Sequence, residues 1–279
     1  MRKWLIASIL ILAALFVWMP LWLLISGSLT GSEEAARNLA PVLDEKAGSA
    51  LWPLLPRYPT LRSLIELLLD TPQFFIMFWN SCRQVFPVVI GQVAVGAPAA
   101  WAFARYRFRG RKILFSLYIV LMLMPFQVTM VSSFLVLDAV GLMDTVWAII
   151  LPGAASTFPV FIMVRFFAAI PSALAEAAAL DGAGPFQVFW RLGLPLGAPG
   201  ILSAVVLGFL EYWNALEIPL TFLRDKTLWP LSLYLPAITA DNAGVSLVAS
   251  VIMLIPALLI FLFGQKYLEQ GITASGMKE

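Results

Sequence analysis

The chain has 279 residues and a net charge of +2, and 61% of its residues are hydrophobic while only 12% are charged. A soluble domain carries about 25% charged residues, so this composition excludes an ordinary water-soluble fold and predicts a membrane protein. One cysteine and no histidine exclude an internal disulfide, a Cys/His metal site and a histidine-based catalytic triad.

The hydropathy pattern predicts six membrane-spanning helices. We expect them at Trp4–Ile25, Asn80–Ala104, Ile113–Leu137, Val146–Phe167, Gly200–Leu220 and Val245–Phe263. Each run is continuously apolar and lacks the alternation of barrel strands, so the predicted fold class is an all-α membrane protein. The first run is longer than the apolar region of a signal peptide, and no small-residue cleavage site follows it, so we expect it to be a retained span.

Basic residues in short loops predict the orientation of the spans. The short loop Tyr106–Lys112 carries four basic residues and directly follows Arg105. The basic residues assigned to the opposite side lie mostly in one long loop, and long loops have little weight in the positive-inside rule. Both termini and the loop Tyr106–Lys112 are therefore predicted to be cytoplasmic. We expect this loop to set the topology and to contact lipid headgroups.

The predicted spans divide the chain into four parts. Residues 1–25 are the first transmembrane helix, and residues 26–79 are a long extracytoplasmic loop. Residues 80–265 form the core transmembrane domain, and residues 266–279 form a cytoplasmic tail. Within the core domain, residues 168–199 make a cytoplasmic loop that carries the strongest signal in the sequence.

This cytoplasmic loop is predicted to contain a short exposed helix. Pro171 suits a helix start, the following Ala/Leu/Glu run has high helix propensity, and Asp181-Gly182 is typical of a helix end. A second short helix is expected from Gly184-Pro185 to about Leu192, with Pro195 and Pro199 marking the return to the bilayer. The small residues with two carboxylates suit insertion into a groove of another protein. The alternative to docking is that this helix only connects two spans and lies on the membrane surface.

The loop also resembles a known signature. Its sequence from Glu176 to Ala183, Glu-Ala-Ala-Ala-Leu-Asp-Gly-Ala, followed by Phe189-Trp190-Arg191 and Leu194-Pro195-Leu196, resembles the EAA loop of permease subunits in binding-protein-dependent ABC importers. Other segments, in the same order, are similar to the smaller maltose-type sugar permease. They are Arg57–Leu61, Asn80-Ser81, Ala102–Arg105, Phe108–Lys112, Pro125, Gly141-Leu142, Arg165–Phe167 and Trp213-Asn214.

The resemblance implies a type I ABC importer permease fold with a cytoplasmic coupling helix that docks on a partner ATPase. The residues that would form this contact are Glu176, Ala177, Ala178, Asp181, Gly182 and Ala183, with Pro195 setting the angle at which the chain leaves the loop. In this reading the helix couples closure of the ATPase to alternating access. One departure from the family pattern is Glu211, where relatives more often carry an uncharged residue.

The sequence has no phosphate-binding loop of its own, because it contains no Gly-Lys dipeptide. We therefore expect a non-catalytic translocation subunit without a bound cofactor, with ATP and Mg²⁺ held by the partner. The resemblance implies two ATPase subunits, a second homologous permease, an extracytoplasmic solute-binding protein and membrane lipid as partners, with no nucleic acid. It also implies a bacterial-type inner membrane. Tyr58, Pro59 and Thr60 either contact the binding protein or belong to a loop that packs on the spans.

A polar stripe on the fifth span is the candidate solute path. Glu211, Asn214 and Glu217 recur at helical spacing, Tyr212 lies beside them, and carboxylates with aromatic rings suit sugar hydroxyls and rings. There are two alternatives to solute binding. Glu217 lies at the external interface of the membrane, or the polar face forms interhelical hydrogen bonds with the partner permease. The family resemblance favours a sugar or an oligosaccharide as the solute.

Two other classes compete with an importer permease. An ion-gradient-driven secondary transporter would be expected to show inverted repeats and broken helices with acids in midspan, and it would leave the Glu176–Ala183 loop unexplained. A membrane-embedded enzyme is disfavoured by the absence of histidine and of paired catalytic carboxylates.

Overall fold

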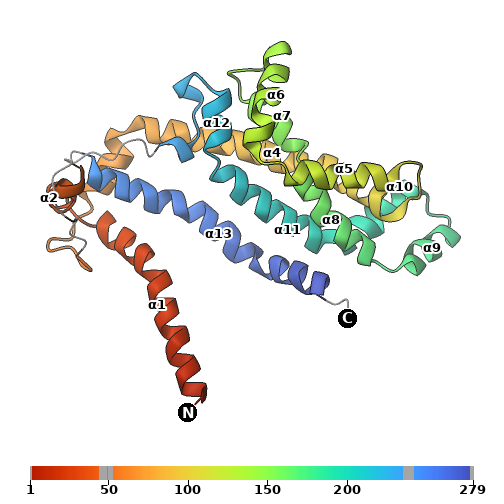
Figure 1. The fold of residues 1–279 in the computed structure, drawn as a ribbon, viewed down its shortest axis with the longest axis horizontal. Coiled ribbons are helices and arrows are strands. Elements are labelled where there is room, and N and C mark those ends of the chain that lie inside the picture. The colour runs from red at the N-terminus through yellow and green to blue at the C-terminus, as the bar shows by residue number, and fades with distance from the viewer. Residues whose placement is uncertain (1, 44–48, 50–52, 235–241, 277–279) are drawn as a thin grey trace. The chain divides into compact units, whose positions relative to one another are not determined.

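The computed structural model describes residues 2–43, 49, 53–234 and 242–276 (Figure 1). These residues are mainly helical, and an isolated bridge between Thr30 and Pro59 is their only strand-like pairing. The α-helices are α1 (Arg2–Ser28), α2 (Ser32–Leu43), α3 (Arg62–Ile65), α4 (Pro72–Arg105), α5 (Arg111–Leu123), α6 (Phe126–Ala139), α7 (Trp147–Ala154), α8 (Thr157–Ala169), α9 (Ser172–Leu180), α10 (Pro185–Val188), α11 (Leu194–Trp213), α12 (Glu217–Phe222) and α13 (Ala243–Gly276). The π-helical segments η1 (Glu66–Asp70) and η2 (Phe189–Gly193) and the 3₁₀ segments η3 (Lys226–Leu228) and η4 (Leu231–Leu233) complete the described elements.

The helices confirm an all-α membrane protein. Among the described residues, 5 helices are long and apolar enough to cross a membrane, and the number rises to 6 if the bent pair α5 and α6 is one span. Helix α4 begins at Pro72, eight residues before the predicted start of the second span. In hydrocarbon a helix satisfies its own backbone groups, which explains why long apolar runs take this form.

The third span is not the continuous helix predicted over Ile113–Leu137. Helices α5 and α6 meet at an angle of 105°. Met124 and Pro125 between them are extended, with ψ values of 123° and 148°. Proline has no N–H to continue the helix and disfavours helical geometry at the residue before it. The break therefore follows from Pro125.

The fifth span also differs from its prediction. The short helix expected to end near Leu192 continues through η2 into α11, giving an apolar helix over Pro185–Trp213. Pro195 is the second residue of α11, which directly follows the π-helical segment η2, so Pro195 lies inside this longer helix. The span was predicted to reach Leu220, but α11 ends at Trp213 and a separate helix, α12, begins at Glu217.

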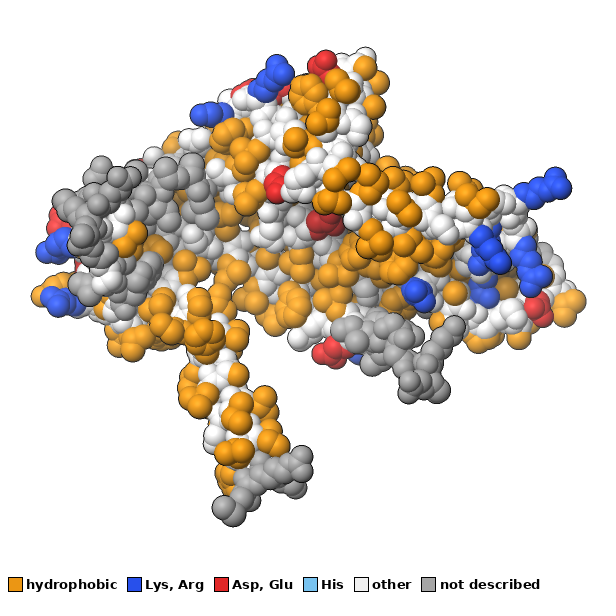
Figure 2. Space-filling view, in the orientation of Figure 1, with side chains coloured by type: hydrophobic (Ala, Val, Ile, Leu, Met, Phe, Trp, Pro, Cys, Tyr) orange, Lys and Arg blue, Asp and Glu red, His pale blue; other side chains and the backbone are white. Residues whose placement is uncertain are grey.

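The chain forms two compact units, which are described separately. The first unit holds residues 1–78 and 233–256, and the second holds residues 79–232 and 257–279. In the first unit, α1 is exposed and apolar around its circumference between Trp4 and Trp22 (Figure 2). The exposed fractions reach 80% at Trp4 and 78% at Phe16. A helix that is apolar on every side requires lipid or another apolar partner around it.

The second unit has a core in which α8 and α11 pack closely. An added Cβ on Gly197 would lie 2.2 Å from Phe167, and one on Gly200 would lie 2.5 Å from Phe166. Small residues at such positions let two membrane helices approach, which strengthens their van der Waals contact. The buried part of this core includes Trp101, Met163, Phe167, Phe189 and Ala204.

Candidate functional site

The predicted cytoplasmic helix is present as α9, and it lies on the surface of the second unit. It runs from Ser172 to Leu180, directly after Pro171, and none of its residues is buried. The prediction of a helix that starts at the proline and ends at Asp181-Gly182 is confirmed. A surface helix composed of small residues leaves its backbone accessible to another protein.

A Schellman motif ends α9. Gly182 has a φ of +84°, its N–H donates to the carbonyl of Ala179 at 3.1 Å, and the N–H of Ala183 donates to the carbonyl of Ala178 at 2.9 Å. This pattern satisfies carbonyls at the helix end and requires a residue that tolerates a left-handed conformation. An added Cβ on Gly182 would meet nothing within 4 Å, so within this chain the need for glycine is conformational and not steric.

The predicted coupling residues divide into two groups. Glu176, Ala177, Asp181 and Gly182 are exposed and available to a partner. By contrast, Ala178 and Ala183 are partly buried and pack, together with Ala175, against the core of the second unit. The inner face of α9 therefore seats the helix on its own subunit, while the outer face carries the two carboxylates.

Exposed apolar residues beside α9 were not identified from the sequence. Leu180 is 90% exposed, Phe186 is 74% exposed and Trp190 is 60% exposed. The rings of Phe186 and Trp190 stack with centroids 6.1 Å apart and an interplanar angle of 17°. The spacing of four residues between Phe186 and Trp190 could have predicted this contact, because side chains at i and i+4 meet on a helix.

One turn of α4 holds both ends of the loop over residues 168–199, which is predicted to be cytoplasmic. At the start of the loop, an Nη of Arg105 donates a hydrogen bond to the carbonyl of Ile170. The guanidinium of Arg105 lies 5.3 Å from the centroid of the Trp101 ring. At the far end, the Trp101 ring lies 5.8 Å from Phe189, and an added Cβ on Gly193 would lie 2.9 Å from it. Arg105 and Trp101 thus connect the chain on either side of α9 to α4, a role that the sequence did not reveal.

The predicted polar stripe is not one helical face. Glu211 is exposed on the last turn of α11, Asn214 follows the helix end, and Glu217 begins α12. The ring of Tyr212 packs against Gly153, where an added Cβ would lie 2.9 Å from Tyr212 Cε1, so Tyr212 contributes to packing. The prediction of a single polar face is wrong because it required a helix that continues past Trp213.

The two other polar residues have partners within the second unit. Glu217 accepts a hydrogen bond from Gln127 Nε2 at 2.6 Å, which joins α12 to α6. The amide of Asn214 donates to the carbonyl of Leu210 at 2.8 Å. Solute contact by Glu211, Tyr212, Asn214 and Glu217 stays a prediction.

The segment with Tyr58, Pro59 and Thr60, which is predicted to be external, belongs to the first unit. Tyr58 is 81% exposed, and Pro59 is exposed beside it. Thr60 is half-buried, with its N–H donating to the carbonyl of Leu29 at 2.8 Å and its hydroxyl oxygen accepting from the N–H of Arg62 at 3.2 Å.

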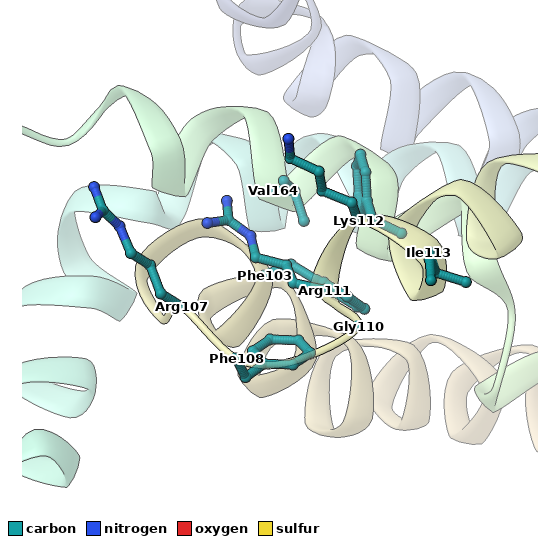
Figure 3. Close-up of a pocket in the computed structure, with 9 residues that line it drawn as sticks. Phe103, Arg107, Phe108, Gly110, Arg111, Lys112, Ile113 and Val164 are labelled. Atoms are coloured by element: carbon teal, nitrogen blue, oxygen red, sulfur yellow. The ribbon is translucent and has the colours of Figure 1, made fainter.

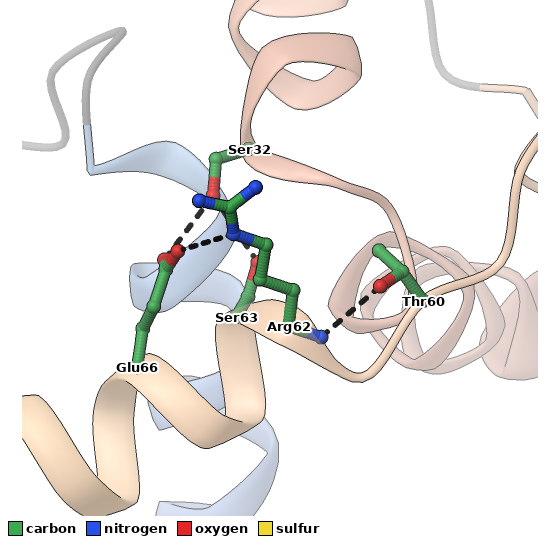
Figure 4. A network of polar contacts seen from close by, with 5 residues as sticks. All are labelled: Ser32, Thr60, Arg62, Ser63 and Glu66. Atoms are coloured by element: carbon green, nitrogen blue, oxygen red, sulfur yellow. Dashed lines mark hydrogen bonds and ion pairs between the residues drawn. The ribbon is translucent and has the colours of Figure 1, made fainter.

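A polar network next to Thr60 fixes this segment (Figure 4). Arg62 Nε lies 3.1 Å from a carboxylate oxygen of Glu66, and the hydroxyls of Ser32 and Ser63 lie 3.3 Å apart. The network joins α2 to α3 and η1. It leaves Tyr58 and Pro59 as the exposed part of the predicted contact.

The described residues contain no group of three His, Cys, Asp or Glu side chains that could hold a metal ion. That ATP and Mg²⁺ are held by another subunit stays a prediction.

Comparison with known proteins gives consistent matches. Residues 92–274 match the family of binding-protein-dependent transport system inner membrane components. An arabinooligosaccharides transport system permease protein of Halalkalibacterium halodurans is 27% identical over 279 residues, covering 99% of this chain and 96% of the relative.

Two solved structures share the fold. One is a bacterial ABC transporter involved in the import of the acidic polysaccharide alginate, with a TM-score of 0.79, 22% identity and coverage of 95% of this chain and 96% of the other. The second is a bacterial alginate ABC transporter in complex with an alginate pentasaccharide-bound periplasmic protein, with a TM-score of 0.62, 18% identity and coverage of 94% and 93%.

Proposed function

Because this chain belongs to the family of binding-protein-dependent transport system inner membrane components, we propose that it is the membrane subunit of an ATP-driven importer of sugars or oligosaccharides. Family membership favours this function over an ion-gradient-driven transporter. The relative named for arabinooligosaccharides and the structures of alginate importers support a carbohydrate solute. The location we propose is a bacterial inner membrane.

The observation that carries the proposal is the construction of α9. The helix has no buried residue, presents Glu176 and Asp181 outward, and is closed by a Schellman motif at Gly182. An exposed helix of small residues can enter a groove on a partner with its backbone close to the groove walls. The partner we propose is a cytoplasmic ATPase, which binds ATP and Mg²⁺.

The contacts at the two ends of the loop explain how force could reach the spans. When the ATPase closes, it moves α9. Because Ile170 is bonded to Arg105, and Phe189 and Gly193 pack on Trp101, a displacement of α9 acts on α4 as well as on α8 and α11. Rigid helices that rotate in this way alternate the access of a central solute path.

We propose the remaining subunits by analogy with the family. We propose two ATPase subunits and a second homologous permease, so that the solute path lies between two membrane subunits. An extracytoplasmic binding protein would deliver the solute, and the exposed Tyr58 and Pro59 are the contact we propose for it. Glu211, exposed on α11, is the residue of this chain most suited to bind sugar hydroxyls.

Charge reversal on α9 tests the proposal. The permease is purified with its partner subunits from cells that carry Glu176→Lys, Asp181→Lys or the control Glu269→Lys. Glu269 is an exposed carboxylate of the same unit but lies on α13, outside the loop. We expect the ATPase to be lost from the first two preparations and retained in the control. Equal retention of the ATPase in all three preparations would contradict the proposal.

A further inference from the structure

A cavity of about 770 Å³ lies where the chain turns from α4 into α5 (Figure 3). It is formed within the second unit by the end of α4, the basic loop, the first turn of α5 and one residue of α8. None of the coupling residues and none of the predicted solute-path residues lines it. The proposed transport function therefore leaves this cavity without a role.

One wall of the cavity is aromatic. Phe103, Phe108 and Phe115 contribute to the lining. The ring of Phe103 lies 5.9 Å from that of Phe108 and 5.5 Å from that of Phe115, so the three side chains form a contiguous apolar surface. Such a surface suits the hydrocarbon part of a ligand and gives nothing to a small inorganic ion.

The cavity also has a cationic side. Arg107, Arg111 and Lys112 line it, and in Figure 3 their charged ends extend in one direction, away from the Phe108 ring. Among the described residues, none of these three cations has a carboxylate within ion-pair distance. Arg111 and Lys112 also begin α5, and the positive end of a helix dipole adds to the attraction for an anion.

The position of the cavity identifies the kind of ligand. The basic loop lies on the side that the positive-inside rule assigns to the cytoplasm, at the ends of two apolar helices. The adjoining surface of α5 is apolar and exposed, with 76% of Ile113 and 49% of Leu117 accessible. A ligand that matches all these features has an anionic head and a long apolar body. Anionic lipids of the cytoplasmic leaflet have this chemistry.

We propose that this cavity binds one anionic glycerophospholipid of the cytoplasmic leaflet. Its phosphate lies among Arg107, Arg111 and Lys112, and an acyl chain follows the aromatic wall and the exposed side of α5. The bound lipid neutralises these three cations, which lie in the chain just after Arg105, the residue that bonds to Ile170.

Arg109 offers a matched control for this site. It belongs to the same loop, two residues before Arg111, and it is exposed but does not line the cavity. A general attraction between basic residues and an anionic membrane would treat Arg109 and Arg111 alike. A built site distinguishes them, because only Arg111 is half-buried in the cavity wall.

The experiment uses the assembled transporter in detergent, titrated with dioleoyl phosphatidylglycerol and followed by native mass spectrometry. We expect one tightly bound lipid for this subunit. Arg111→Gln should weaken that binding about tenfold, since it removes a charge-assisted hydrogen bond, and Arg109→Gln should change it less than about twofold. Arg111→Lys, which keeps the charge, should bind within about threefold of the unchanged protein.

Competition separates the lipid from its parts. Neither phosphatidylcholine nor soluble glycerol phosphate should displace phosphatidylglycerol at equal concentration, because the first lacks net negative charge and the second lacks acyl chains. The proposal is overturned if Arg109→Gln and Arg111→Gln have equal effects, or if either competitor displaces the lipid. Absence of a retained lipid from the assembled transporter would overturn it as well.

Discussion

Replacing Gly182 by alanine tests whether the end of α9 controls docking. Gly182 has a φ of +84°, and an added Cβ would meet no atom within 4 Å, so the whole cost of the change is conformational. A non-glycine residue in the left-handed region costs about 1 to 2 kcal/mol. The alternative for alanine is to leave the left-handed conformation. The helix end then unwinds, and the hydrogen bonds donated by the N–H groups of residues 182 and 183 are broken. ATPase affinity should therefore fall roughly five- to thirtyfold.

The control is Gly184→Ala in the same loop. Gly184 also has open space around it, but its φ is −70°, which alanine adopts without strain. Binding of the purified ATPase to the permease pair in nanodiscs gives the affinity of each variant. We expect Gly184→Ala to bind like the unchanged protein and Gly182→Asn to recover part of the loss, since asparagine tolerates the left-handed region. Equal affinities for Gly182→Ala and Gly184→Ala would refute the reasoning.

Three further predictions concern other parts of the chain. Arg105→Ala should retain the ATPase but lower solute uptake per ATP hydrolysed about tenfold in proteoliposomes, because it breaks the bond to Ile170; an unchanged ratio would contradict this. Gly197→Ala places a Cβ 2.2 Å from Phe167 and should destabilise the fold by about 1 to 3 kcal/mol, seen as a lower Tm; an unchanged Tm would count against the packing described here. The pKa of Asp225 is lowered because its carboxylate accepts from the N–H two residues later. Because the pKa is lower in the folded state, ionised Asp225 stabilises its turn at every pH above its unfolded-state pKa of about 3.9. This stabilisation is lost as the pH falls through the folded-state pKa. In limited proteolysis we expect the turn at Asp225 to be cleaved faster below about pH 4 than at about pH 7, and Asp225→Asn to speed its cleavage at about pH 7. Cleavage at neutral pH that Asp225→Asn leaves unchanged would contradict this prediction.

Local chemistry explains which parts of the fold could be predicted from the sequence. Pro171 and Gly182 marked the ends of α9 because proline fixes φ next to a helix start and glycine adopts the left-handed conformation of a helix end without strain. Pro195 misled the prediction, since it lies inside the helix that runs from Pro185 to Trp213 and not at the end of a loop. Pro125 marked the break between α5 and α6, but the long apolar run concealed it.

The candidate site was only partly predictable for a different reason. The residues on the outer face of α9 lie close together in the sequence, so their spacing was informative. The bond between Arg105 and Ile170 joins positions 65 residues apart, and no local pattern encodes it. The cavity beside Arg111 depends on three helical segments at once, and only its basic residues were visible as a pattern.

Attachment of the cytoplasmic loop at both ends also affects how the complex is assembled. A free loop would lose much conformational entropy when an ATPase captured it, and each ordered rotamer-rich side chain would add about 0.5–1.5 kcal/mol to the cost of binding. Here the inner face of α9 already rests on its own subunit through Ala175 and Ala178. Docking can then proceed nearly as a rigid-body encounter, so that most differences in affinity between variants should arise in the dissociation rate.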